Sequence, residues 1–331
     1  MSGRDVTADG PAEVRHAPLP GAEVLPDVGG FTHAAVLHDG EDLDWTGSLL
    51  HQVAAGGFPA HVIATARTQN VLRAGLDPLA AVRFDDMTEL GRNPARIIPA
   101  ALSFSDEQAG QHLYCVWEPA WPSRSAAELH EVARHEALVN LAFKDHPMTV
   151  ACLYDTSCLP GGVLRDAELT HPVVITSGRP HSSRSYLDGR FPPGCDDPLP
   201  PAASDATSVS FESYLAPVRE FSASRARAAG LDRMRASDLV LAVSEIAANA
   251  LGHAGGGGVV RAWCTGDELI CQIEDYGCIT DPLAGRRRLP AEAAGGHGLW
   301  LVNRVCDLVE RRTGQDGTIT RLHMRRAAGE R

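Results

Sequence analysis

Hydrophobic and polar positions divide the chain into two units with different patterns. In the first unit, residues 30–189, short apolar runs alternate with stretches in which apolar residues recur at helical spacing. The strand-like runs are residues 34–37, 61–65, 113–117 and 148–153, and the helical stretches are residues 43–55, 69–74 and 125–143. Because strands that alternate with helices usually pair in parallel, we expect an α/β domain with a mostly parallel sheet.

The second unit, residues 211–327, has another order of elements. Its predicted helices are residues 214–229, 238–253 and 299–306, and its predicted strands are residues 259–265, 269–274, 308–313 and 318–324. Strands that follow one another through short Gly-containing turns favour antiparallel pairing. We therefore expect an α+β sandwich, with helices on one face of a mixed, largely antiparallel sheet.

A proline-rich segment separates the two units. Residues 190–210 hold five prolines within 192–201, which predicts a semi-rigid linker. Residues 1–29 lack the apolar core of a signal peptide and are predicted to be a disordered tail. Because no apolar run approaches the roughly 18 residues of a membrane span, no membrane association is expected.

Charge and cysteine content narrow the function classes. The net charge is −12, and residues 205–331 hold 16 acidic and 16 basic residues, so the acidic excess lies before them. Without a broad basic face, nucleic-acid binding is not expected as the main function. The eight cysteines form no CxxC pair and no zinc-finger spacing with histidine, which indicates structural thiols in the cytoplasm. Cys152 and Cys158 are the two candidates for redox activity.

A polar stripe interrupts the predicted helix 238–253. Glu245, Asn249 and His253 recur at every fourth position and so lie on one face of the helix. A carboxamide oxygen is a suitable ligand for hydrated Mg²⁺, and a carboxylate one turn away can deprotonate a hydroxyl or water. Taken alone, the stripe favours a solvated polar face.

Two downstream clusters favour a nucleotide pocket. Asp275 and Gly277 follow a strand, where glycine lets a flat ligand approach the backbone. Gly295, Gly296 and Gly298 precede a helix, whose free N–H groups and dipole favour phosphate. A glycine-rich loop alone can be only a flexible turn, but the ordered series of all three clusters is more specific.

With these motifs, residues 211–326 resemble the GHKL ATPase superfamily, and most closely the anti-sigma-factor serine kinases of the RsbW type. The resemblance implies that Glu245 is the catalytic base and that Asn249 coordinates Mg²⁺. It implies that Asp275 binds the adenine amino group beside Gly277, and that Thr318 completes the adenine pocket. The further ATP-binding residues that it implies are His253, Gly295, Gly296, His297, Gly298 and Leu299.

The resemblance leaves several activities to compare. The helix at 214–230 contains no histidine, which argues against a histidine autokinase, and the unit is too short for the extra domain of gyrase or MutL. Among the remaining activities, the resemblance implies an anti-sigma factor that phosphorylates Ser or Thr of an anti-anti-sigma (STAS) protein, and related kinases tend to form homodimers. The alternatives are a nucleotide-dependent binding switch without kinase activity and a sensor with a vestigial ATP site. The segment 277–298 is the expected lid over the phosphates, and it contains Arg286, Arg287 and Arg288. These arginines would reach a triphosphate or an acidic partner, or simply belong to a mobile loop.

The first unit carries no GxxxxGK[ST] loop, and His135-Glu136 is followed by Val139 where a zinc-protease motif needs histidine. Its polar clusters, among them GRNPARIIP, WEPAWPSR and RHEALVNLAF, resemble the MEDS sensory domain that precedes GHKL domains in RsbA-type regulators. Trp117 and Leu153 depart from that family's usual Gly and Pro. The resemblance implies a RecA-like fold that senses a small-molecule ligand. For His135, Glu136 and His171, internal hydrogen bonding and ligand binding remain the two alternatives.

Overall fold

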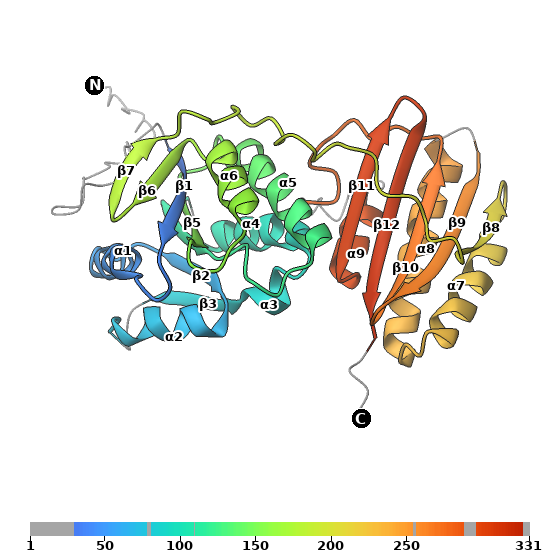
Figure 1. The fold of residues 1–331 in the computed structure, drawn as a ribbon, viewed down its shortest axis with the longest axis horizontal. Coiled ribbons are helices and arrows are strands. Elements are labelled where there is room, and N and C mark those ends of the chain that lie inside the picture. Colours follow the sequence, from blue (N-terminus) through green and yellow to red (C-terminus); the bar gives the residue numbers. More distant parts are fainter. Residues whose placement is uncertain (1–29, 78–80, 109, 254–255, 288–295, 327–331) are drawn as a thin grey trace, which may run out of the picture.

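The protein folds into two domains that lie side by side (Figure 1). The computed structural model describes residues 30–77, 81–108, 110–253, 256–287 and 296–326. The expectation of an α/β domain followed by an α+β domain is confirmed.

The N-terminal domain is built on a seven-stranded sheet in the order β3-β2-β4-β5-β1-β6-β7. Every pairing is parallel except that of β6 with β7. The strands are β1 (Phe31–His38), β2 (Ala60–Ala64), β3 (Val82–Asp86), β4 (Leu113–Trp117), β5 (Met148–Asp155), β6 (Val173–Thr176) and β7 (Arg179–Ser182).

Helices cover both faces of this sheet. Its helical elements are α1 (Asp44–Ala55), α2 (Ala66–Ala74), α3 (Met87–Leu90), the 3₁₀ helix η1 (Pro94–Arg96), α4 (Ile97–Glu107), α5 (Ala126–Phe143) and α6 (Gly161–Thr170). One apolar cluster joins α1 and α2 to one face, and a second joins α4, α5 and α6 to the other. Neighbouring strand residues such as Ala151 and Cys152 therefore belong to opposite cores.

The C-terminal domain is a five-stranded sheet in the order β11-β12-β10-β9-β8, and every described pairing is antiparallel. Its elements are β8 (Thr207–Phe211), α7 (Ala216–Ala228), α8 (Arg233–His253), β9 (Gly258–Thr265), β10 (Glu268–Asp275), α9 (His297–Val305), β11 (Leu308–Gly314) and β12 (Gly317–Arg325). The three helices pack on one face of the sheet around an apolar core. Two elements differ from the sequence prediction: α8 begins at Arg233 rather than residue 238, and β8 begins within the segment assigned to the linker.

The other face of this sheet is covered by the linker and by the N-terminal domain. Arg312 on β11 donates to the carbonyl of Asp197, and Arg321 on β12 donates to the carbonyl of Pro200. Helix α5 lies against the same strands, as Figure 1 shows for the green helix beside β11. The proline-rich segment is thus packed along the sheet instead of only spanning the gap between two domains.

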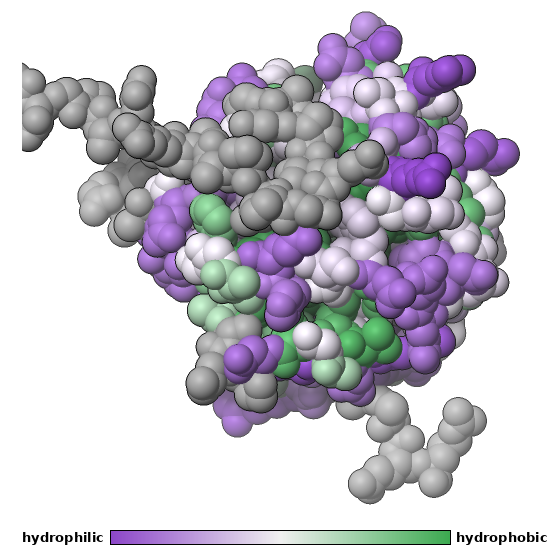
Figure 2. Space-filling view, turned by 90° about the vertical axis from the view of Figure 1, so that its left-hand side faces the viewer, coloured by the Kyte–Doolittle hydropathy of each residue, from purple (hydrophilic) through white to green (hydrophobic). Residues whose placement is uncertain are grey.

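On the face shown in Figure 2, hydrophilic residues make up most of the visible surface, and smaller apolar areas are scattered among them. None of the described helices is both long and apolar enough to cross a membrane.

Candidate functional site

Two of the three motifs of the C-terminal domain, the polar stripe and the glycine cluster, meet at one place. Glu245 and Asn249 are half-buried on α8, and Gly298 at the start of α9 lies directly against them. A Cβ atom on Gly298 would lie 2.6 Å from Glu245 Oε2 and 3.6 Å from Asn249 Nδ2. The first two residues of the polar stripe, Glu245 and Asn249, are therefore neighbours in space of Gly298, although about fifty positions separate them in the chain.

Helix α9 begins with a backbone suited to an anion. Gly296 precedes it in the left-handed conformation, with a φ of 84°, which a residue with a side chain rarely adopts. The first N–H groups of the helix have no partners within the helix and carry the positive end of its dipole. The Glu245 carboxylate lies beside this helix start, against Gly298. Helix starts of this kind favour a phosphate group.

Asp275, Gly277 and Thr318 form a second cluster, at the end of β10. Asp275 at the end of β10 pairs with Thr318 on β12. Asp275 Oδ1 accepts a hydrogen bond from the Gly277 N–H at 2.7 Å, and the Thr318 hydroxyl donates to the Gly277 carbonyl at 2.7 Å. Gly317 makes this close approach feasible, since a Cβ there would lie 2.0 Å from the Asp275 carbonyl. Partial burial raises the pKa of the Asp275 carboxyl.

Most of the site residues predicted from the sequence fall into two clusters. Glu245, Asn249 and Gly298 come together, as do Asp275, Gly277 and Thr318. His297 and Leu299 lie in the first turn of α9, and Leu299 packs against Gly285. Gly295 and Arg288 lie outside the described residues, and so does the side chain of His253, the last residue of α8.

Arg286 of the predicted lid takes an internal position. It is buried, with Nη2 3.7 Å from Glu131 Oε2 on helix α5 of the N-terminal domain. Arg312 on β11 shares the same carboxylate and donates to Glu131 Oε1 at 2.8 Å. This arginine thus contacts a carboxylate within the same chain, a position that none of the sequence-based alternatives described.

Sequence reasoning missed a second contact, which holds the far end of α9. Asn93, which caps η1, donates to the carbonyl of Asn303 at 3.1 Å. Arg96 donates to the carbonyls of Asn303 and Cys306, the former at 2.8 Å. Arg96 and Asn93 belong to the GRNPARIIP cluster. Its polar residues beside proline were the only signal in the sequence that could have indicated this contact. The helix that begins at the candidate phosphate site therefore ends on the N-terminal domain.

The N-terminal domain has a small pocket at the carboxyl ends of its parallel strands, the edge where α/β sheets usually bind ligands. Its cavity of about 180 Å³ is lined by His38, Thr65, Glu118, Trp121 and Asp155, among others. Burial raises the pKa of Glu118, although its carboxylate accepts the Thr65 N–H at 2.7 Å. The pocket therefore combines the aromatic side chain of Trp121 with the carboxylates of Glu118 and Asp155, which hydrogen bonds hold in a fixed orientation.

Comparison with known families agrees with this geometry. Residues 32–172 match MEDS, the methanogen/methylotroph, DcmR sensory domain. Residues 209–324 match the histidine kinase-like ATPase domain. No curated protein matches the chain. The two matched segments coincide with the parallel-sheet domain and the antiparallel-sheet domain of the structure. The chain therefore carries a MEDS sensory domain followed by a histidine kinase-like ATPase domain.

Proposed function

We propose that this protein is an ATP-dependent anti-sigma factor whose N-terminal domain controls its C-terminal domain. In this proposal the C-terminal domain holds a sigma factor inactive and transfers the γ-phosphoryl group of ATP to a Ser or Thr of a STAS-type anti-anti-sigma protein. The family match supports an ATP-binding, kinase-like domain. The identity of the phosphate acceptor and of the sigma factor rests on the resemblance of the motifs to RsbW-type kinases.

The residues present fit Mg·ATP. Asn249 offers a carboxamide to the metal, which would neutralise charge on the transferring phosphoryl group. Gly298 leaves open the space that a Cβ would fill beside Glu245, and the start of α9 offers unpaired N–H groups to phosphate. Glu245 lies next to that helix start and is placed to accept the proton of an attacking hydroxyl. Asp275, fixed by the Gly277 N–H, offers its other carboxylate oxygen to a base amino group.

The observation that carries the regulatory part of the proposal is the pair of contacts between the domains. The N-terminal domain holds both the base of the lid, through Glu131 and Arg286, and the end of α9, through Asn93 and Arg96. These two segments bound the phosphate side of the candidate ATP site. A ligand that shifts α5 or η1 would therefore change the lid and α9 without touching the nucleotide.

Two further features support a cytoplasmic protein with a small-molecule sensory domain. All eight cysteines are free thiols, which is usual for proteins of the reducing cytoplasm. The pocket at the carboxyl ends of β1, β2, β4 and β5 is a suitable place for the small molecule that a sensory domain recognises.

A phosphoryl-transfer assay tests the proposal. The full chain is mixed with Mg²⁺, radiolabelled ATP and a candidate STAS protein. We expect label on the STAS protein, and we expect Glu245→Ala to abolish the label while ATP binding remains. Glu220→Ala is a matched control, since Glu220 is an exposed glutamate on α7 of the same domain.

The outcomes separate the alternatives. ATP binding with no labelled partner, across the STAS proteins tested, would instead support the nucleotide-dependent binding switch. Failure to bind ATP would contradict both functions and leave a sensor with a vestigial nucleotide site.

A further inference from the structure

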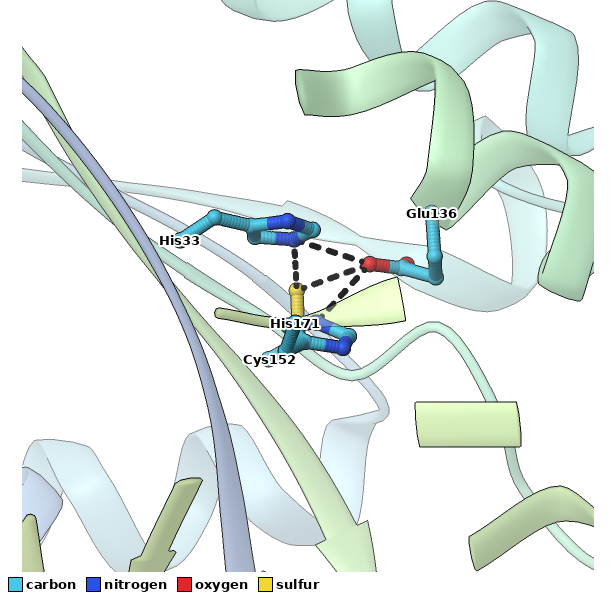
Figure 3. Close-up of side chains that lie close together, drawn as sticks. All are labelled: His33, Glu136, Cys152 and His171. Carbon is cyan, nitrogen blue, oxygen red and sulfur yellow. Dashed lines mark hydrogen bonds and ion pairs between the residues drawn. The ribbon is translucent and has the colours of Figure 1, made fainter. Parts of the chain in front are cut away.

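Four side chains with metal-ligating atoms converge inside the N-terminal domain (Figure 3). They are His33 on β1, Glu136 on α5, Cys152 on β5 and His171 directly after α6. All four are buried, with at most 1% of each residue exposed. One ligand atom from each lies within 4.8 Å of the others.

The distances centre on one carboxylate oxygen. Glu136 Oε2 lies 3.0 Å from His33 Nε2, 3.1 Å from His171 Nε2 and 3.3 Å from Cys152 Sγ. Cys152 Sγ is 3.5 Å from His33 Nε2. In Figure 3 the four side chains point toward one another from elements on different sides of the cluster.

The hydrogen bonds around the cluster determine where the ring protons lie. His171 Nδ1 is 2.8 Å from the carbonyl of Ala167, and a carbonyl only accepts, so Nδ1 carries the hydrogen. Asn140 donates from Nδ2 to the carbonyls of Glu136 and Thr170, so its Oδ1 is an acceptor. His33 Nδ1, 3.1 Å from that oxygen, therefore also carries a hydrogen.

In neutral imidazoles with this tautomer, both Nε2 atoms present lone pairs to the cluster. His171 Nε2 has no hydrogen-bond partner among the described residues, although Glu136 Oε2 is 3.1 Å away. Two nitrogen lone pairs thus face an anionic oxygen at contact distance, an arrangement that repels unless a positive charge lies between them.

We propose that His33 Nε2, Glu136 Oε2, Cys152 Sγ and His171 Nε2 form a binding site for a divalent transition-metal ion, with Zn²⁺ as the best fit. Two imidazoles, a thiolate and a carboxylate are a borderline-soft, four-ligand set of the kind that zinc takes in tetrahedral geometry. Tetrahedral Zn–N and Zn–S bonds place neighbouring ligand atoms about 3.3–3.6 Å apart, close to the spacings here. Zn²⁺ with Glu136 and the Cys152 thiolate, its proton released to solvent, would be electrically neutral in this buried place.

The surroundings match those of a closed site. Each imidazole donates its other N–H to a carbonyl or amide oxygen, the support that metal-bound histidines usually have. Four protein ligands leave no open position for a substrate, and burial blocks access, so the ion would have a structural or sensory role rather than a catalytic one. This inference does not depend on the kinase proposal, since the ligands belong to the other domain.

Metal analysis of the full chain tests the site. Protein produced in zinc-supplemented medium and dialysed without chelator is expected to keep about one zinc per chain. After replacement by Co²⁺, we expect a thiolate-to-cobalt charge-transfer band and the intense visible bands of four-coordinate cobalt. Cys152→Ala should remove the charge-transfer band, and Asn140→Ala should weaken metal binding about 10- to 100-fold.

Two controls make the result specific. Cys115→Ala removes an equally buried thiol from neighbouring strand β4 and should change nothing. Replacing the exposed Cys158, Cys264 and Cys278 by serine should likewise leave the metal content unchanged. If Cys152→Ala does not fold, the wild-type cobalt spectrum decides. Folded wild-type chain that keeps no zinc and gives no charge-transfer band, or a Cys152→Ala variant that keeps both, would overturn the proposal.

Discussion

Gly298 shows how a single residue can matter to the nucleotide site without mattering to the fold. It occupies the second position of α9, where alanine would normally favour the helix by up to about 1 kcal/mol. Glycine is instead suited to this position because the Glu245 carboxylate occupies the space that a side chain would need. Because the atom in the way is the end of a flexible side chain, a substitution displaces Glu245 rather than the backbone.

We expect Gly298→Ala to leave the unfolding temperature unchanged or slightly raised, and to lower ATP turnover by about 10- to 100-fold. Calorimetry and a phosphate-release assay measure the two effects. Gly252→Ala is the matched control, because Gly252 is exposed on α8 and a Cβ there meets nothing within 4 Å. Full turnover in Gly298→Ala would argue against Glu245 acting at this place.

His323 gives the C-terminal domain a pH-dependent contribution to stability. It is buried on β12 between Glu268 at 3.0 Å and Glu310 at 2.9 Å. Burial alone would lower the pKa of His323, but the hydrogen bonds and charges of the two carboxylates outweigh it and raise the pKa to about 9. A group with a raised folded pKa stabilises most below its unfolded pKa of about 6.5, and that stabilisation is lost as pH rises through about 9.

The free energy of unfolding is therefore expected to fall by up to about 3 kcal/mol between pH 6.5 and pH 9.5 through this group. Urea unfolding across this pH range measures the slope, and His323→Gln should flatten it. His181→Gln, an exposed histidine on β7, is the control and should retain the wild-type slope. Equal slopes for His323→Gln and the wild type would show that the ion pair does not form.

At the scale of elements, α5 does the most to connect the parts of the molecule. Its start has a capping box in which Ser125 accepts from the Glu128 N–H and the Glu128 side chain accepts from the Ser125 N–H. Glu128 also pairs with Arg325 of β12 at 3.1 Å, while Glu136 further along belongs to the buried histidine–cysteine cluster. One helix thus contacts the ATPase domain and the proposed metal site.

We expect Ser125→Ala to lower the free energy of unfolding of the N-terminal domain by about 1 kcal/mol, because an N–H at the helix start loses its partner. Urea unfolding monitored by circular dichroism measures the loss. Ser123→Ala, two residues earlier and also exposed, should have no measurable effect. A loss shared equally by both variants would mean that the cap is not the cause.

For the whole molecule, the interface between the domains is held by charges that are largely withdrawn from water. Glu131 is buried between Arg286 and Arg312, and burial lowers the pKa of Arg286 to about 10 even beside that carboxylate. Removing one member of such a buried group typically costs about 3–5 kcal/mol, since the remaining charges lose their partner. We therefore expect the loss of Glu131 on α5 to loosen the contact with Arg286.

Glu131→Gln is expected to speed amide hydrogen exchange in residues 281–287 and 308–314, and to leave exchange in β1 unchanged. Hydrogen-exchange mass spectrometry of the full chain resolves these segments. Glu107→Gln provides the control, because Glu107 pairs with Arg83 on an exposed surface, where ion pairs contribute little. Unchanged exchange at the lid base would contradict the proposed coupling between the domains.

The two fold classes and most of the long elements follow from local pattern. Apolar spacing within one helix or strand depends only on nearby residues, which is why 125–143 and 148–153 were predicted within a few residues of α5 and β5. The nucleotide motifs were equally readable, since Glu245 and Asn249 lie one turn apart and Asp275 and Gly277 are near neighbours in the chain. Short elements such as η1 and β7 contain too few apolar residues to show a helical or strand-like periodicity, so they were not predicted.

Contacts between distant residues were decided only in the tertiary structure. Arg312 and Glu131 are 181 positions apart, and His33 and Glu136 are 103 apart, so no spacing in the sequence connects them. Arg286 was read as part of a charged lid, yet its burial depends on how α5 packs against the second sheet. Cys152 was singled out in the sequence only as a candidate for redox activity, and the parallel pairing of β1 and β5 places it beside His33. Local chemistry thus indicated the ATP site, whereas domain packing created the interface and the buried four-ligand cluster.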